Sequence, residues 1–168
     1  MRIFIALVFK DSSIDELVEL QNGLKDRYAG RYISSNNLHM TLAFLGEVEE
    51  ALIPTLQTIV QNSFLDIKAL QTNHINMLQK NILVLSFASC PDLMLYREVL
   101  VNNLKKKMFK IDNHPFVPHI TLARDVSDCY FASKEYDKTL TISGVALMAS
   151  TLLPNEARYQ IIDFKKME

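Results

Sequence analysis

The stretch that decides the fold is "LHMTLAFLGEV", Leu38–Val48, an apolar run that carries two polar side chains. Side chains alternate between the two faces of a β-strand, so His39 and Thr41 share one face of the predicted strand. Met40, Leu42 and Phe44 share the other face, and we interpret them as core. Such a strand can pack on a hydrophobic core with one face and present an imidazole and a hydroxyl with the other.

The same pattern returns downstream in "PHITLARDV", Pro118–Val126, where His119 and Thr121 again share a strand face. The frame His-x-Thr-Leu-Ala is common to both stretches, and its x position is apolar in each. A single strand histidine usually has an ordinary structural role, but two of the chain's four histidines occupy this one frame. The repeat therefore predicts two related halves whose His-x-Thr pairs meet at one cleft.

Two imidazoles and two hydroxyls suit a reaction at phosphorus. An unperturbed histidine titrates near pH ~6.5, so one imidazole can act as an acid and the other as a base. Threonine hydroxyls can donate hydrogen bonds to the non-bridging oxygens of a phosphate. A catalytic zinc site usually takes three protein ligands, and neither motif has H-E-x-x-H spacing or a carboxylate companion. We therefore predict transfer at phosphorus with no metal and no other cofactor.

The rest of the chain predicts one α+β domain, residues 1–168. The length suits a single domain with a full core, and 49% apolar with 22% charged residues is a globular composition. Strand patterns outnumber helical patterns and few crossovers are evident, so we expect antiparallel sheets. We predict strands at Arg2–Phe9, Leu38–Leu45, Asn73–Leu78, Ile82–Ala88, Val117–Arg124, Thr139–Ser150 and Arg158–Phe164.

Three helices are predicted between these strands. A capping-box pattern at Ser13–Glu16 precedes the first amphipathic segment. Glu49–Phe64 is predicted to be helical with Pro54 in its first turn, and Pro91 opens the third helix. Residues 125–138 have the composition of a long irregular connection.

Charge and cysteine usage limit the environment and the partners. The net charge of −1 gives no global basic field for long nucleic acid, so recognition of phosphate must be local. Cys90 and Cys129 have no metal-ligand spacing, and we expect free thiols in a reducing cytosol. The N-terminal run lacks the features of a signal peptide, and no run approaches the ~20 apolar residues of a membrane span. We expect a cytoplasmic protein that does not contact a membrane.

At the two motifs the sequence resembles the two-histidine phosphoesterase superfamily and, within it, the RNA 2′,3′-cyclic phosphodiesterase family, also called 2′-5′ RNA ligase. The likeness covers nearly the whole chain, from "MRIFIAL" through "NNLHMTLAFLGEV" and "PHITLAR" to "TLLPNEARYQII". Two departures lie outside the motifs. Asn155–Ala157 stands where the family often has a glycine, and Tyr32 and Ile33 stand where Trp-Val is common. These departures bear only on the local loop shape and the substrate rim.

The resemblance implies a bilobal α+β fold in which two antiparallel β-sheets flank a central cleft, with helices on the outer faces and pseudo-two-fold related lobes. It implies metal-independent hydrolysis of an RNA 2′,3′-cyclic phosphodiester to a 2′-phosphomonoester, on RNA ends or small nucleotides. It also implies His39 as proton donor, His119 as proton acceptor, and Thr41 and Thr121 as phosphate ligands. We expect the protein to act as a monomer. The motifs are so alike that the residues alone leave the assignment of acid and base open.

Arg124 follows the second motif and is a further candidate for binding phosphate, because its planar guanidinium matches the geometry of phosphate oxygens. Strict alternation places Arg124 on the strand face opposite His119. It can contribute only if the strand ends or bulges near Ala123, and otherwise it is a surface arginine.

Other activities fit the same residues. A 2′-5′ RNA ligase, or a 2′-5′-phosphodiesterase acting on oligonucleotides or nucleotide metabolites, would use the same acid–base pair. A non-catalytic module that binds RNA ends would keep the cleft, although its sequence signature would be the loss of a motif histidine or threonine, and all four are present.

Overall fold

The computed structural model describes residues 1–127 and 130–167, and Cys129 lies outside them. The fold is α+β, as predicted. Its helices are α1 (Asp11–Lys25), α2 (Ile53–Asn62) and α3 (Pro91–Lys106), with 3-10 helices η1 (Ser35–Asn37) and η2 (Glu50–Leu52). Its strands are β1 (Arg2–Phe9), β2 (Arg31–Tyr32), β3 (Met40–Glu47), β4 (Ala69–Leu78), β5 (Ile82–Phe87), β6 (His119–Arg124), β7 (Lys134–Glu135), β8 (Thr139–Leu152) and β9 (Ala157–Lys166). None of the described helices is long and apolar enough to cross a membrane.

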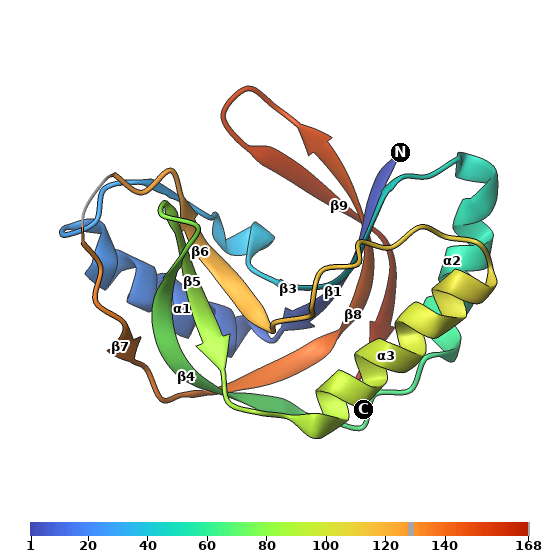
Figure 1. Ribbon diagram of the computed structural model, residues 1–168, viewed down its shortest axis with the longest axis horizontal. Coiled ribbons are helices and arrows are strands. Elements are labelled where there is room, and N and C mark those ends of the chain that lie inside the picture. The colour runs from blue at the N-terminus through green and yellow to red at the C-terminus, as the bar shows by residue number, and fades with distance from the viewer. Residues whose placement is uncertain (128–129, 168) are drawn as a thin grey trace.

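The strands pair in an antiparallel manner and form two groups that meet at β8. One group has the order β3-β1-β8-β9. The other has the order β2-β6-β5-β4, and β4 also pairs with the short β7. The groups join where β4 pairs with the first residues of β8, from Ala69↔Thr141 to Gln71↔Thr139. The two predicted antiparallel sheets are therefore continuous, and they diverge above this junction (Figure 1).

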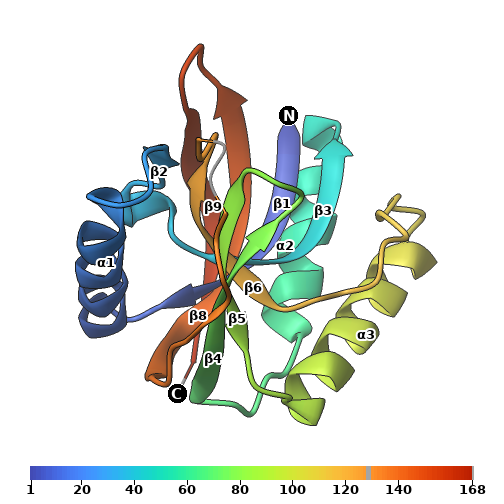
Figure 2. The same cartoon turned by 60° about the vertical axis from the view of Figure 1, so that its left-hand side comes forward.

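The two strand groups form the two halves of the molecule. Each half is contacted by a helix that, in the sequence, follows a strand of the other half. Helix α1 follows β1, yet its Gln21 donates a hydrogen bond to the backbone of β6 at Leu122. Helix α3 follows β5, yet its Arg97 donates a hydrogen bond to the backbone of β3 at Leu42. The two helices lie on opposite sides of the molecule (Figures 1 and 2). This exchange of helices ties the halves together.

Most predicted elements are present, with corrections at their ends. The predicted capping box is wrong: α1 begins at Asp11 without a side-chain cap, and the Ser13 hydroxyl instead accepts a hydrogen bond from the backbone of β8. Strand β4 begins at Ala69, earlier than predicted, and β7 lies in a stretch predicted to be irregular. Pro54 and Pro91 lie in the first turns of α2 and α3, as predicted, where a missing N–H does little harm.

Alternation along the strands separates the core from the cleft. On β1, Ile3, Ile5 and Leu7 are fully buried in the main core, whereas Phe4 and Ala6 belong to a smaller cluster on the opposite face. Full burial of each large aliphatic side chain stabilises the fold by about 1.5–3 kcal/mol. Four of the predicted core residues of the motif strands lie in the main core: Met40, Leu42, Ile120 and Leu122.

Both motif strands contain a β-bulge at the same place. In β3, the two residues that flank Leu42 pair with consecutive residues of β1, so Leu42 has no partner in this register. In β6, the two residues that flank Leu122 pair with consecutive residues of β5 in the same way. A bulge sets two residues against one and bends the strand. Alternation is therefore interrupted after each motif threonine.

Gly144 of β8 provides a test of the packing against β9. An added methyl group would collide with the backbone oxygen of Lys165 and lie 2.7 Å from ring atoms of Phe164. We expect Gly144→Ala to lower the free energy of unfolding by about 1–3 kcal/mol.

Gly23 is the matched control, because a methyl group there meets nothing within 4 Å. Gly23→Ala, in helix α1, should raise the free energy of unfolding by roughly 0.5–1 kcal/mol. Urea unfolding measures both variants, and a parental midpoint for Gly144→Ala would contradict the described packing of β8 and β9.

Candidate functional site

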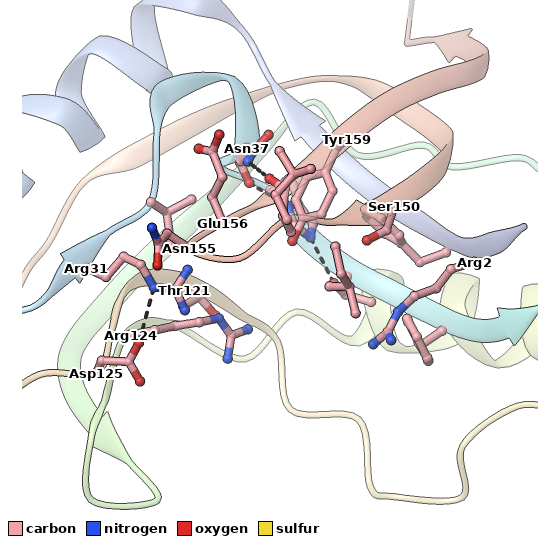
Figure 3. Close-up of a pocket in the computed structure, with 18 of the residues that line it drawn as sticks. Arg2, Arg31, Asn37, Thr121, Arg124, Asp125, Ser150, Asn155, Glu156 and Tyr159 are labelled. Carbon is pink, nitrogen blue, oxygen red and sulfur yellow. Dashed lines mark hydrogen bonds and ion pairs between the residues drawn. The ribbon is translucent and has the colours of Figure 1, made fainter.

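The inner faces of the two halves line a cleft of about 720 Å³. Residues of both motifs line it, together with residues of the hairpin between β8 and β9 (Figure 3). Two motifs that are far apart in the sequence are thereby brought together. The residues selected from the sequence all line this one cleft: His39, Thr41, His119, Thr121 and Arg124.

Two hydrogen bonds hold the ring of His39. Its Nδ1 lies 2.6 Å from the carbonyl oxygen of Asn37, so Nδ1 carries a proton and donates it. Its Nε2 lies 3.0 Å from the hydroxyl of Thr41, which can donate to the neutral imidazole. The side-chain amide of Asn37 in turn donates to the carbonyl oxygen of Ala157 at the start of β9. His39 lies immediately before β3, which begins at Met40 and not at Leu38 as predicted, and its position depends on β9 as well as on β3.

His119 repeats this geometry in the other half. Its Nδ1 lies 2.8 Å from the carbonyl oxygen of Val117, and it donates a hydrogen bond as Nδ1 of His39 does. In both motifs the acceptor belongs to the residue two positions earlier. A donated Nδ1 proton fixes the tautomer, which leaves Nε2 of each ring as the nitrogen that can exchange a proton with a ligand.

The surroundings of His39 include two aromatic rings. Its ring centre lies 5.1 Å from that of Phe4 and 5.3 Å from that of Tyr159, the latter in an edge-on arrangement. Burial lowers the pKa of His39 below its usual value, and the charges of His119 and Arg124 lower it further, although the backbone hydrogen bond opposes this shift. In the unliganded protein His39 therefore favours the neutral form.

The bulges turn a second pair of side chains into the cleft. The prediction that Phe44 belongs to the core is wrong, because its side chain lines the cleft and the residue is 38% exposed. The same interruption in β6 brings Arg124 into the cleft with His119. Arg124 was expected to reach the cleft only if β6 ended or bulged near Ala123. The bulge is present, at Leu122. Phe44 and Arg124 occupy equivalent positions in the two motifs.

Arg2 and Arg31 add positive charge at the two ends of the cleft (Figure 3). The guanidinium carbon of Arg2 lies 4.9 Å from the ring centre of Phe44. Arg31 lies 3.2 Å from a carboxylate oxygen of Asp125. This local charge suits an anionic ligand in a chain whose net charge is close to zero.

Sequence reasoning missed both rim arginines and the supports of His39. Arg2 reaches the cleft because β1 pairs with β3, and Arg31 does so because β2 pairs with β6. Asn37 supports His39 through its backbone carbonyl, which any residue type could supply. The sequence shows Asn37 two residues before His39, but no residue pattern marks a backbone acceptor. Nor does any residue pattern reveal which strands pair, so the positions of Arg2 and Arg31 could not be predicted.

The polar groups that line the cleft are mainly imidazole, hydroxyl and guanidinium, together with the carboxylates of Asp125 and Glu156. Within residues 1–127 and 130–167, no three His, Cys, Asp or Glu side chains lie close enough together to hold a metal ion. Hydrogen-bond donors and cations of this kind are suited to phosphate oxygens.

A protein-family model described as the 2′-5′ RNA ligase superfamily matches residues 9–150, a span that contains both motifs. The chain belongs to this superfamily. Relatives of known name carry the same family likeness along nearly their whole length. The RNA 2′,3′-cyclic phosphodiesterase of Escherichia coli (strain K12) is 27% identical, and the match covers 94% of this chain and 92% of the relative. The protein of the same name from Aquifex aeolicus is 26% identical, with 97% and 95% covered.

Solved structures share the fold of this superfamily member. TT0787 of Thermus thermophilus superposes with a TM-score of 0.84 at 23% identity, covering 99% of this chain and 97% of the other. Escherichia coli LigT complexed with 3′-AMP superposes with a TM-score of 0.79 at 22% identity, also covering 99% and 97%. The architecture of two halves around a cleft is therefore that of known structures.

The lowered pKa of His39 gives a prediction that does not depend on catalysis. Followed by NMR of the imidazole carbon-bound protons, His39 should titrate with a midpoint below ~6.5 in the unliganded protein. Inorganic phosphate bound in the cleft should raise the midpoint, because a nearby anion favours the imidazolium form. Arg124→Met removes a positive charge and should also raise it. A midpoint at or above the usual value in the parent protein would contradict the burial of His39.

Proposed function

We propose that this protein hydrolyses the 2′,3′-cyclic phosphate of RNA ends or small nucleotides to a 2′-phosphomonoester. One observation supports this most directly. Both histidines donate a hydrogen bond from Nδ1 to a backbone carbonyl, which leaves Nε2 of each ring to interact with a ligand in the same cleft. Membership of the superfamily and the names of the two relatives agree with it. All the proposed groups come from one chain, so a monomer can carry out the reaction, for which we propose the cytoplasm as the location.

The proposed reaction is a displacement at phosphorus. Nε2 of His119 accepts a proton from water, and the water oxygen forms a bond to phosphorus. The bond from phosphorus to the ribose 3′ oxygen breaks, and Nε2–H of His39 donates its proton to that oxygen. The phosphate stays on the 2′ oxygen. Proton transfers return both imidazoles to their starting states, so no metal is required.

His39 must be protonated to act as the acid, although its pKa is lowered in the free protein. The positive charges of His119 and Arg124 repel a proton on His39. A bound phosphodiester anion offsets this repulsion and therefore favours the imidazolium form of His39. Protonation of His39 is thus coupled to binding of the substrate. The Thr41 hydroxyl, which contacts Nε2 in the unliganded cleft, is then available to donate to a phosphate oxygen.

The remaining cleft residues stabilise charge and hold the nucleoside. Thr41 and Thr121 donate hydrogen bonds to non-bridging oxygens, and Arg124 supplies a guanidinium to the same anion. The exposed ring of Phe44 is available to stack on a nucleobase, and the guanidinium of Arg2 lies beside this ring. Stacking of a base on an aromatic ring is tolerant of base identity, which suits RNA ends of varied sequence.

The central test is turnover of adenosine 2′,3′-cyclic phosphate in excess EDTA. We expect activity to persist, and His39→Ala and His119→Ala each to lower kcat by at least ~100-fold through loss of acid–base work. His114→Ala is the control, because this exposed histidine lies in a loop and bonds to Asp112 outside the cleft. Product analysis distinguishes hydrolysis from ligation when RNA with a 5′-hydroxyl is added. Binding without turnover, or full activity of either motif variant, would overturn the proposal.

A second test addresses the phosphate ligands. Thr41→Val and Thr121→Val keep the shape of the side chain but remove one hydrogen bond to a charged oxygen, which is worth about 1.5–3 kcal/mol. We expect each variant to lower kcat/KM by roughly 10- to 100-fold. Steady-state kinetics measures the loss. Unchanged kinetics in both variants would exclude the threonines as phosphate ligands.

A third test addresses base stacking. Phe44→Ala should lower kcat/KM for the cyclic nucleotide by about 10-fold or more, because base–aromatic stacking contributes about 1–3 kcal/mol. It should leave hydrolysis of ribose 2′,3′-cyclic phosphate, which has no base, nearly unchanged. Equal losses on the two substrates would show that Phe44 acts by some means other than stacking.

A further inference from the structure

The two bulges have carbonyl groups that are bound by side chains from the exchanged helices. Leu122, the bulge residue of β6, accepts a hydrogen bond from Nε2 of Gln21 at 2.9 Å. Leu42, the bulge residue of β3, accepts one from Nε of Arg97 at 3.1 Å. The acceptor is therefore the same motif position in each half, and the donor comes from the helix that follows a strand of the other half.

Gln21 is buried in the body of the protein, at 2% exposure. Its side-chain amide has two N–H donors, and they reach the carbonyl oxygens of Ile33 and Leu122 at 2.8 and 2.9 Å. The backbone N–H of Ile33 also donates to Leu122. Gln21 thus joins β6 to the segment that follows β2, at the residue immediately before the alternation changes. Arg124 lies two residues further along the same strand.

Arg97 makes the corresponding contact from α3. Its guanidinium carbon lies 5.0 Å from the ring centre of Phe116, while its Nε bonds to Leu42. Stacking on one face and a hydrogen bond from Nε hold the side chain in one orientation. Phe44 lies two residues beyond the bulge that Arg97 binds.

We propose that Gln21 and Arg97 are positioning residues: Gln21 fixes the bulge that turns Arg124 toward the phosphate, and Arg97 fixes the bulge that turns Phe44 toward the base. Neither residue is among those that line the cleft. Without Arg97, the carbonyl of Leu42 loses its side-chain donor, and without Gln21, the carbonyl of Leu122 loses one of the two donors named above. The strand can then relax toward ordinary alternation, which directs Phe44 or Arg124 away from the cleft. This inference rests on the proposed function for its kinetic readout.

The test is a pair of crossed double-mutant cycles on adenosine 2′,3′-cyclic phosphate. Gln21→Met keeps the length of the side chain and removes both N–H donors. We expect it to lower kcat/KM about 10-fold in the parent protein and in Phe44→Ala, but less than about 2-fold in Arg124→Ala, because the contribution it supports is already absent.

Arg97→Met should give the opposite pattern. We expect a loss of about 10-fold in the parent protein and in Arg124→Ala, and less than about 2-fold in Phe44→Ala. Arg97→Lys keeps a donor and should recover part of the activity. Losses of equal size in all backgrounds, for either position, would overturn the positioning role for that residue, since a general effect on folding does not depend on which cleft residue is present.

Ser13→Ala is the structural control. Ser13 lies on α1 with Gln21, is 3% exposed, and its hydroxyl accepts a hydrogen bond from β8 rather than donating one to a motif strand. It should lower the urea midpoint while leaving kcat/KM within about 2-fold, as expected of a distant, independent site. If Gln21→Met does not fold, Gln21→Asn, which retains the amide with a shorter reach, takes its place with the same expected pattern.

Binding of 2′-AMP, measured by calorimetry, separates failure of this inference from failure of the proposed function. Without turnover by the parent protein, the proposed function fails, yet the Gln21–Arg124 cycle can still be completed on the dissociation constant. Dependence of the Gln21→Met effect on Arg124 supports the positioning role, and additivity overturns it. If the parent protein neither turns over the cyclic nucleotide nor binds 2′-AMP, both proposals are overturned.

Discussion

A hydrogen bond from Nδ1 of each motif histidine to the carbonyl oxygen two residues earlier is the interaction on which the site depends. The acceptor is backbone, so its position is fixed by the path of the chain into β3 and β6 and cannot rotate away as a side chain can. Because Nδ1 is committed to this donor role, Nε2 is the only nitrogen left for a ligand. The pairing of β3 with β1 and of β6 with β5 then determines the direction in which each Nε2 points.

The two halves repeat one geometry but differ in what surrounds it. His39 is enclosed by Phe4 and Tyr159 and is tied through Asn37 to β9, whereas His119 is the first residue of β6 and bonds to Val117 in the loop before it. An enclosed imidazole resists taking a charge until an anion is present. Symmetry of the motifs therefore supplies the pair of groups, and the enclosure of His39 lowers the pKa of its imidazole.

Much of the fold and most of the site followed from two simple sequence properties. Alternation of apolar and polar residues, together with the repeated His-x-Thr frame, was sufficient to predict the longer strands, the separation of core from cleft, and the set His39, Thr41, His119 and Thr121, but not the two-residue strands β2 and β7. The bulges could not be predicted, because Leu42 and Leu122 are ordinary strand residues whose special role depends on register and on donors from distant helices. For this reason strict alternation predicts Phe44 in the core, and it directs Arg124 toward the cleft only if the strand ends or bulges. Arg2 and Arg31 reach the cleft only through pairing of strands far apart in sequence.

The exchange of α1 and α3 has a consequence for any division of the chain. The tight turn at Gln79 and Lys80, where both residues have positive φ, separates a segment containing β1, α1 and β3 from one containing α3, β6 and β8. Each segment holds one motif histidine, and each holds the helix that contacts the other's motif strand. After a cut at this turn, neither segment alone would contain both the bulge and the side chain that bonds to its carbonyl. The protein thus consists of two complementary segments, and both motif histidines line one cleft only when the two are assembled.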